Sequence, residues 1–164
     1  MKNILVIGAA GQIGSELVPA LRKLGFMTVA GFSRTPLTPE LAAGGPSERI
    51  DILDGTGLVD VIRRHRIDTV FNLAAMLSAK AEAQPLSAWN VGVNGLLNVL
   101  EAARIEHCAV FTPSSIGVFG DSTPHAKTPQ DTVCRPKTVY GITKVTGELL
   151  SDYYFLKYGV DTRS

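Results

Sequence analysis

The chain has 164 residues, of which 45% are hydrophobic, and its mean hydropathy is +0.16. This is enough for one folded domain with a core of its own. The formal net charge is +1, so there is neither a basic field for nucleic acid nor an acidic tail. No stretch approaches the roughly 20 apolar residues that a membrane span needs. We therefore expect a small-molecule ligand, and neither nucleic acid nor a membrane as partner.

The few cysteines and histidines give no sign of a metal site. Cys108 and Cys134 lack metal or redox spacing, and His65, His107 and His125 share no ligand spacing, so we predict packing roles for all five. The first apolar run is only about one strand long, and a glycine-rich loop follows it directly, unlike a signal peptide. A reducing cytoplasm is the compartment that fits this pattern.

Short apolar runs alternate with helical patterns along the chain. The predicted strands are Asn3–Gly8, Met27–Phe32, Glu48–Ile52, Asp68–Ala75 and Cys108–Ser115. The predicted helices are Ile13–Gly25, Gly57–Arg66, Pro85–His107 and Thr138–Tyr158, with residues 33–47 as a loop. Strands separated by helices are typical of a Rossmann-type, doubly wound α/β fold with a parallel sheet, here of at least five strands.

The last residues, VDTRS at Val160–Ser164, read as the opening of a sixth strand. A sheet that ended there would have an unfinished edge. We therefore expect the chain to be the N-terminal portion of a longer protein. Its residues 1–164 would form one domain, without the lobe that closes over a substrate.

Between the first strand and the first helix lies Gly8-Ala-Ala-Gly11-Gln-Ile-Gly14. The first glycine permits a tight turn, the second lets the backbone approach a pyrophosphate, and the third lets helix and strand pack closely. Free N–H groups at the start of the helix then face the phosphate charge. The pattern predicts an NAD(P)-binding domain, in which the loop residues in contact with cofactor are Gly8, Gly11, Gln12, Ile13 and Gly14.

The end of the second strand bears on the choice of cofactor. A carboxylate there would bond the ribose hydroxyls of NAD, but the sequence has Ser33 and Arg34. Charge favours the 2′-phosphate of NADP, unless Arg34 simply points into water. Asp51, followed by Ile52, is placed to receive the adenine amino group. Small residues after the fourth strand would let a cofactor lie against its end: Leu73, Ala74 and Ala75.

The stretch VYGITKVTGELL places Tyr140 and Lys144 four residues apart, on one face of a helix. One interpretation is a solvated lysine beside a packed tyrosine. In the other, the cation stabilises a phenolate that can take a proton near neutral pH.

Together these motifs resemble the extended short-chain dehydrogenase/reductase family. The resemblance covers the whole chain, but only the N-terminal half of a typical member. Within the family the sequence is most similar to the short-chain L-threonine 3-dehydrogenases, through NLAAMLSA, FTPSSIGVFG and the run from Thr128 to Leu150. It departs from them at Ser33, where they usually have an acid, and at Gly92, where they usually have an asparagine.

The resemblance implies a reaction and roles for particular residues. Tyr140 would be the general base, Lys144 would support it and hold the nicotinamide ribose, and Ser115 would bond the substrate oxygen. Ser114, Ser115, Tyr140 and Ser78 would contact substrate. Hydride would pass from the C3 alcohol of L-threonine to a nicotinamide cofactor, NAD or possibly NADP, to give 2-amino-3-ketobutyrate.

The resemblance also implies a homodimer, formed by the helices 85–107 and 138–158, with Trp89 in the interface or in the core. Two alternatives stay open for the function. One is a nucleotide-sugar epimerase or dehydratase of the same family, and the other is a non-catalytic NAD(P)-binding fragment or module. The 164-residue chain alone is expected to be inactive, because its substrate would lie in an open, wet cleft.

Overall fold

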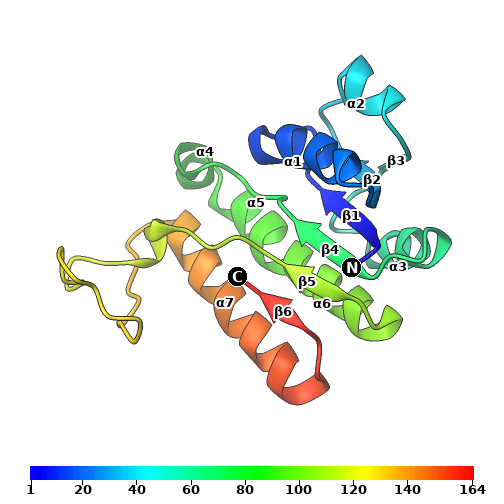
Figure 1. The fold of residues 1–164 in the computed structure, drawn as a ribbon. Coiled ribbons are helices and arrows are strands. Elements are labelled where there is room, and N and C mark those ends of the chain that lie inside the picture. Colours follow the sequence, from blue (N-terminus) through cyan, green and yellow to red (C-terminus); the bar gives the residue numbers. More distant parts are fainter.

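Six strands form one parallel sheet in a computed structural model that describes residues 1–164. The strand order is β3-β2-β1-β4-β5-β6, so the chain starts at the centre of the sheet and works outward in two directions (Figure 1). The strands are β1 (Asn3–Ile7), β2 (Met27–Phe32), β3 (Ser47–Arg49), β4 (Thr69–Asn72), β5 (Ala109–Phe111) and β6 (Thr162–Arg163). The predicted doubly wound fold is confirmed, including the sixth strand.

Helices join the strands and run along the sheet. They are α1 (Gln12–Lys23), α2 (Pro39–Ala43), α3 (Gly55–Arg64), α4 (Ser78–Ala83), α5 (Pro85–Trp89), α6 (Gly95–Glu106) and α7 (Val139–Tyr158). A π-helical turn, η1 (Asn90–Asn94), links α5 to α6, and a 3-10 turn, η2 (Ile116–Val118), follows β5. Thr138 caps α7 by accepting a hydrogen bond from the Gly141 N–H, and Gly159 ends it with φ of 69°, as a left-handed glycine typically does.

The two faces of the sheet carry two separate cores. Val70 and Val110 point to the larger one, which packs against α3, α6 and α7. Ile4 and Val6 point to the smaller one, against α1. Because neighbouring residues of a strand alternate between faces, every side chain from Ile4 to Ile7 in the central strand β1 is buried.

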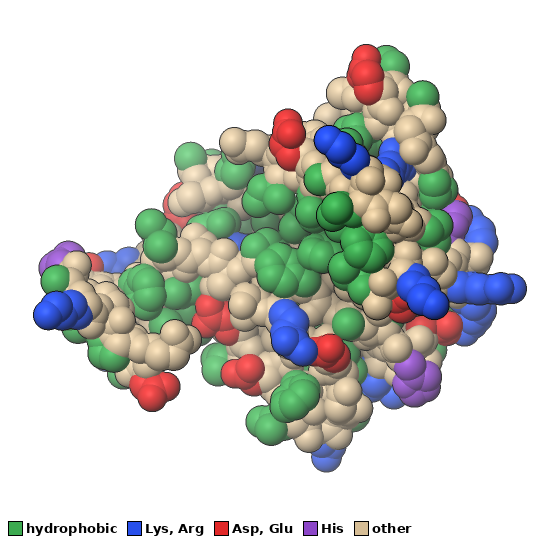
Figure 2. Space-filling model, in the orientation of Figure 1, with side chains coloured by type: hydrophobic (Ala, Val, Ile, Leu, Met, Phe, Trp, Pro, Cys, Tyr) green, Lys and Arg blue, Asp and Glu red, His purple; other side chains and the backbone are tan.

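Part of the α1 side of the sheet has no helix over it. Phe71 of β4 and Phe111 of β5 lie there half-buried, with ring centroids 5.4 Å apart. Both line an open hollow of about 570 Å³ together with Ala109 and Arg163. Figure 2 shows hydrophobic side chains gathered over this part of the sheet.

Several predicted boundaries were wrong, for physical reasons. Residues 33–47 were predicted as loop, but contain α2, which has Thr38 as N-cap and Pro39 in its first turn. The strands β4 and β5 end at Asn72 and Phe111, so the segments that follow them are irregular backbone at the carboxyl edge of the sheet. The predicted third strand was placed too far along the chain, because β3 pairs only up to the last residue of β2.

The predicted long helix Pro85–His107 is divided into α5, η1 and α6. The division falls in NVGVNG, where Gly92 and Gly95 weaken the helix and Asn94 bonds the Asn90 side chain. The short helix α4 was not predicted, since it begins at Leu77, which gives no side-chain cap. The helix α1 continues through Pro19 without a break.

Candidate active site

The glycine-rich loop joins β1 to α1 with little space to spare. Gly8 has φ of 86°, a conformation that favours glycine. A Cβ at Gly14 would lie 2.3 Å from the Gly8 carbonyl oxygen and 2.7 Å from the Ala9 Cα, so the helix packs directly on the turn. Gly11 is the N-cap of α1 and has no side chain that could satisfy the free N–H groups there. This turn leaves backbone donors available at the start of a 12-residue helix.

The turn opens on a cleft of about 690 Å³ along the carboxyl edge of β1, β2 and β3. This volume lies within the ~300–1,000 Å³ typical of small-molecule sites. The cleft brings together nine of the predicted cofactor residues, namely Gly8, Gly11, Ser33, Arg34, Asp51, Ile52, Leu73, Ala74 and Ala75. Five others do not line it: Gly14 is buried against the turn, Gln12 and Ile13 are exposed at the start of α1, and Tyr140 and Lys144 line a second pocket.

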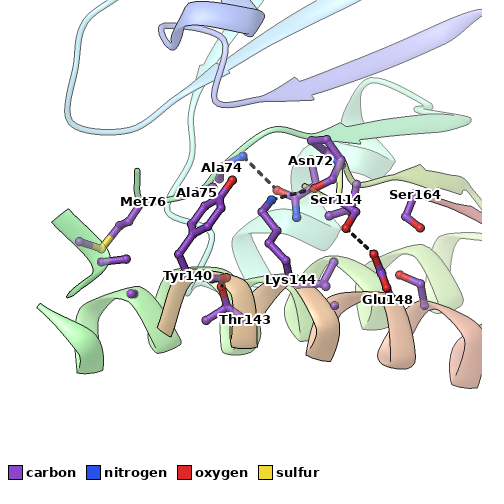
Figure 3. A pocket seen from close by; sticks show the side chains of 18 residues that line it. Asn72, Ala74, Ala75, Met76, Ser114, Tyr140, Thr143, Lys144, Glu148 and Ser164 are labelled. Carbon is purple, nitrogen blue, oxygen red and sulfur yellow. Dashed lines mark hydrogen bonds between the residues drawn. The ribbon is translucent and has the colours of Figure 1, made fainter. Parts of the chain in front are cut away.

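A second pocket lies between α7 and the ends of β4 and β5 (Figure 3). Tyr140 and Lys144 lie side by side in it, with the Lys144 Nζ 5.7 Å from the centre of the Tyr140 ring. The Lys144 Nζ donates a 2.7 Å hydrogen bond to the Pro113 carbonyl oxygen. Burial lowers the pKa of the Lys144 ammonium. A lysine held in this way keeps its charge beside the phenol, at the cost of desolvation.

The three predicted serines line two different hollows, and Tyr140 borders both of them. Ser115 and Ser78 line an open hollow of about 500 Å³, and Tyr140 forms part of its wall. The Ser115 hydroxyl accepts a 3.2 Å hydrogen bond from the Gly117 N–H, which caps η2. Ser114 lines the second pocket instead and donates a hydrogen bond to Glu148. The structure therefore brings Ser115 and Ser78 together on one side of Tyr140, whereas Ser114 lies with Tyr140 and Lys144 in the second pocket.

Sequence reasoning missed two features of this site. Glu148 lies one turn beyond Lys144 on the same side of α7 (Figure 3), and the spacing 140, 144, 148 could have indicated it. The start of α7 also presses against η2, because a Cβ on Gly141 would lie 2.1 Å from the Gly117 carbonyl oxygen. Glycine at both positions brings Tyr140 up to the turn that follows Ser115.

The cleft and the second pocket meet at the end of β4. Ala74, Ala75 and Met76 line both of them. A long ligand could therefore extend from the glycine turn, past these small side chains, to Tyr140 and Lys144. This is the path that a dinucleotide takes across the carboxyl ends of the strands in an open parallel sheet.

The fold is that of a Rossmann-type α/β domain, with a tyrosine–lysine pair in the pocket that adjoins its cleft. The model of the NAD dependent epimerase/dehydratase family matches residues 4–164. The chain belongs to this family. None of its helices is both long and apolar enough to cross a lipid bilayer.

The chain spans only about half the length of the relatives that it matches. An uncharacterized epimerase/dehydratase of Staphylococcus epidermidis is 49% identical over 166 residues, which are 100% of this chain and 52% of the relative. An L-threonine dehydrogenase structure from Clostridium difficile is 47% identical with a TM-score of 0.95, over 99% of this chain and 52% of that one.

Two further solved structures are similar to the chain, one of an L-threonine 3-dehydrogenase and one of an epimerase. A monomeric L-threonine 3-dehydrogenase from a metagenome is 42% identical with a TM-score of 0.90, over 98% of this chain and 51% of that one. A UDP-glucose 4-epimerase from Brucella ovis, in complex with NAD, also has a TM-score of 0.90 but is 25% identical, over 99% of this chain and 50% of that one. The fold is thus shared by two kinds of enzyme, and the sequence is more similar to the threonine dehydrogenases.

Proposed function

We propose that the protein is a nicotinamide-dependent dehydrogenase that oxidises the C3 alcohol of L-threonine to 2-amino-3-ketobutyrate. The observation that carries the chemistry is the position of Tyr140, which borders both the pocket with Lys144 and the hollow with Ser115. The observation that favours threonine is the 47% identity to an L-threonine dehydrogenase, against 25% to an epimerase of the same fold.

The residues of the site suit the two halves of an alcohol oxidation. The Ser115 hydroxyl donates to the substrate oxygen and orients it, while the Tyr140 phenolate removes the hydroxyl proton. The bond between C3 and its hydrogen breaks with the electron pair leaving as hydride, and the C3–O bond becomes a carbonyl. A bound nicotinamide supplies the hydride acceptor. The Gly8–Gly14 turn fits its pyrophosphate, since Gly11, the N-cap of α1, has no side chain that could block approach to the backbone donors.

Lys144 has a supporting role in this scheme. Its ammonium is anchored to the Pro113 carbonyl, and from there it stabilises the negative charge on Tyr140. The same ammonium is one of the groups at the end of the cleft that can contact the nicotinamide ribose. The chain itself would bind cofactor without turnover, because the hollow beside Ser115 is open to water.

A nucleotide-sugar epimerase or dehydratase is the second candidate. The observation in its favour is the TM-score of 0.90 to a UDP-glucose 4-epimerase. The same tyrosine and lysine would serve both reactions, so substrate must decide. A non-catalytic NAD(P)-binding module is the third candidate, in view of the half-length match to the relatives.

Turnover in the longest form of the protein that its gene encodes tests these candidates. L-Threonine-dependent reduction of NAD or NADP supports the dehydrogenase, and turnover of UDP-sugars without it supports the epimerase. Tyr140→Phe should reduce turnover by roughly 10²–10⁴-fold, the usual contribution of a general base, while cofactor binding persists. Tyr158→Phe is the matched control, since Tyr158 is an exposed tyrosine at the far end of the same helix. Equal activity in both variants would remove Tyr140 from the mechanism.

The protein is also proposed to form a homodimer through α5–η1–α6 and α7. One side of α7 exposes a stripe of large apolar residues at helical spacing, namely Ile142, Leu149, Tyr153 and Leu156. The neighbouring helices add Leu86, Trp89 and Leu97, so Trp89 belongs to this surface and not to the core. Such a continuous apolar surface is typical of an interface.

Light scattering after size-exclusion chromatography tests the dimer. Leu156 is 81% exposed on this surface, and Leu77 is 80% exposed outside it. Leu156→Glu should convert a dimer to a monomer, whereas Leu77→Glu should not. A monomeric parent protein, like the metagenomic relative, would refute the proposal.

A further inference from the structure

Two arginines, one just beyond the end of β2 and one at the end of β3, line the cofactor cleft. Arg49, the last residue of β3, pairs in register with Phe32, the last residue of β2, and Arg34 lies two residues beyond Phe32. Both arginines line the cleft, with Ser33 between Phe32 and Arg34. The sequence analysis singled out Arg34 but not Arg49, because the two lie 15 positions apart in the chain.

Neither arginine has a partner within the protein. Arg34 and Arg49 form no ion pair and no side-chain hydrogen bond. By contrast, five other arginines do, namely Arg22, Arg63, Arg64, Arg104 and Arg163. Free guanidinium groups inside a cleft are ready to bind an anion, for which their planar forks of donors are suited.

The acids of the cleft are already engaged with the backbone. Asp51 accepts a 3.0 Å hydrogen bond from the Leu53 N–H, and Asp54 caps α3 by accepting one of 2.9 Å from the Gly57 N–H. The end of β2, where a carboxylate would receive the ribose hydroxyls of NAD, carries Phe32 and Ser33 instead. The outer end of the cleft thus presents two free cations and no free carboxylate at that position.

The wall behind these arginines is fixed by a third one. The Arg22 guanidinium donates to the carbonyl oxygens of Thr28, Leu41 and Pro46. These bonds tie α1, β2 and the segment from α2 to β3 together. The strands that lead to Arg34 and Arg49 are therefore tied together at their starts before any ligand binds, which lowers the entropy lost on binding.

From these observations we propose that the cleft selects NADP over NAD, with Arg34 and Arg49 binding the 2′-phosphate and Ser33 donating to it. The inference rests on the proposed function only for the class of cofactor. It departs from the NAD dependence in the description of the family, and it assigns Arg49 a role in specificity.

Binding of cofactors to the 164-residue chain tests the inference without any need for turnover. Titration calorimetry would compare NADPH with NADH, and 2′,5′-ADP with 5′-ADP. NADPH should bind at least about tenfold more tightly, since a hydrogen bond to a charged group contributes ~1.5–3 kcal/mol. The preference should weaken in high salt.

Variants locate the effect. Arg34→Ala and Arg49→Ala should each weaken NADPH binding about tenfold and leave NADH binding nearly unchanged. Arg135→Ala is the control, an exposed arginine outside the cleft. Ser33→Asp should shift the preference toward NADH. Thermal unfolding of each variant, without ligand, shows whether the fold is intact.

Tighter binding of NADH than NADPH would overturn this inference and leave the proposed dehydrogenase in place. If the arginine variants lost affinity for NADPH and NADH equally, the inference would also be overturned, since the arginines would then not bind the 2′-phosphate. Binding of neither dinucleotide would overturn the inference and the proposed function together.

Discussion

Lys144 is the residue at which function and stability are most directly opposed. Its ammonium is mostly buried, with the Pro113 carbonyl as its one hydrogen-bond partner. Burial of a cation with a single hydrogen-bond partner lowers the free energy of unfolding. An apolar side chain of similar length would not have this cost. The fold tolerates this cost at a position where the proposed chemistry needs a charge beside a phenol.

Replacement of Lys144 by methionine should therefore raise the midpoint of thermal unfolding at neutral pH, by roughly 2–4 °C per kcal/mol recovered. Because burial lowers the pKa of Lys144 from 10.5, the unfolded chain binds this proton more tightly than the folded chain. The stability of the parent should then rise with pH as Lys144 loses its proton.

The difference between Lys144→Met and the parent should accordingly shrink as the pH increases toward 10.5, which scanning calorimetry between pH 7 and pH 10 can measure. Lys157→Met, on the exposed end of the same helix, is the control and should show no such trend. A variant that is less stable than the parent at pH 7 would contradict the desolvation argument.

Side chains introduced at Gly14 and at Gly11 of the turn should have different effects, the first on stability and the second on cofactor binding. At Gly14 a Cβ would lie 2.3 Å from the Gly8 carbonyl oxygen, so Gly14→Ala should destabilise the fold by roughly 1–3 kcal/mol. At Gly11 it would lie 3.2 Å from the same oxygen, and Gly11→Val should abolish dinucleotide binding with little change in stability. Denaturant unfolding and NADPH fluorescence measure both. Unchanged cofactor affinity in Gly11→Val would remove the phosphate-loop interpretation.

At this scale the sequence indicated the residues whose partners are local. The turn of Gly8–Gly14 and the pair Tyr140–Lys144 are readable because their spacing is set by one turn or one helix. Arg49 and Glu148 were missed because their roles depend on a strand register and on a contact with Ser114. The strand register cannot be deduced from spacing, whereas the helical spacing 140, 144, 148 could have indicated Glu148.

Among the elements, the π-helical turn η1 sits where two helices approach most closely. A Cβ at Gly92 would lie 3.0 Å from the Thr143 Cβ of α7, and one at Gly147 would lie 3.1 Å from the Leu96 side chain. At each of these two contacts, a glycine of one helical segment packs against a side chain of the other. This explains why the chain lacks an asparagine at position 92, since Thr143 occupies the space that its side chain would need.

Gly92→Asn should therefore destabilise the protein by roughly 1–3 kcal/mol, the usual cost of overpacking. Removal of the Thr143 γ atoms should relieve part of the crowding, so the double variant Gly92→Asn/Thr143→Ala should be more stable than the sum of the single changes predicts. Urea unfolding of the four proteins gives the coupling energy. Strictly additive effects would mean that the two positions do not compete for space.

Some elements were predicted to within one residue of their observed bounds. The helix Thr138–Tyr158 and the strand Met27–Phe32 agree with α7 and β2. The helix α2 was missed although its signal is present, since Thr38 and Pro39 form an N-cap followed by proline. The ends of β4 and β5 could not be placed, because pairing with a neighbour decides where a strand stops.

On the scale of the whole molecule, the part of the sheet without a covering helix is the surface most prone to non-specific binding. Phe71 and Phe111 lie on the part of the α1 side that no helix of this chain covers. Such a face tends to bind apolar dyes and other chains. The 164-residue chain should therefore increase the fluorescence of a naphthalene sulfonate dye in the native state, and Phe111→Thr should reduce it. Phe119→Thr is a control outside the sheet. Equal dye binding by all three proteins would show that the sheet face is not the site.

The central position of β1 has a consequence for the order of events during synthesis. Asn3–Ile7 leaves the ribosome before both strands that complete its edges, β2, which starts at Met27, and β4, which starts at Thr69. For the time that translation needs to reach Thr69, one edge of the most apolar strand is without its partner. A nascent chain paused in that interval presents a template for pairing with its neighbours on the same message. Slow codons before residue 69 should therefore lower the soluble yield more than slow codons after it.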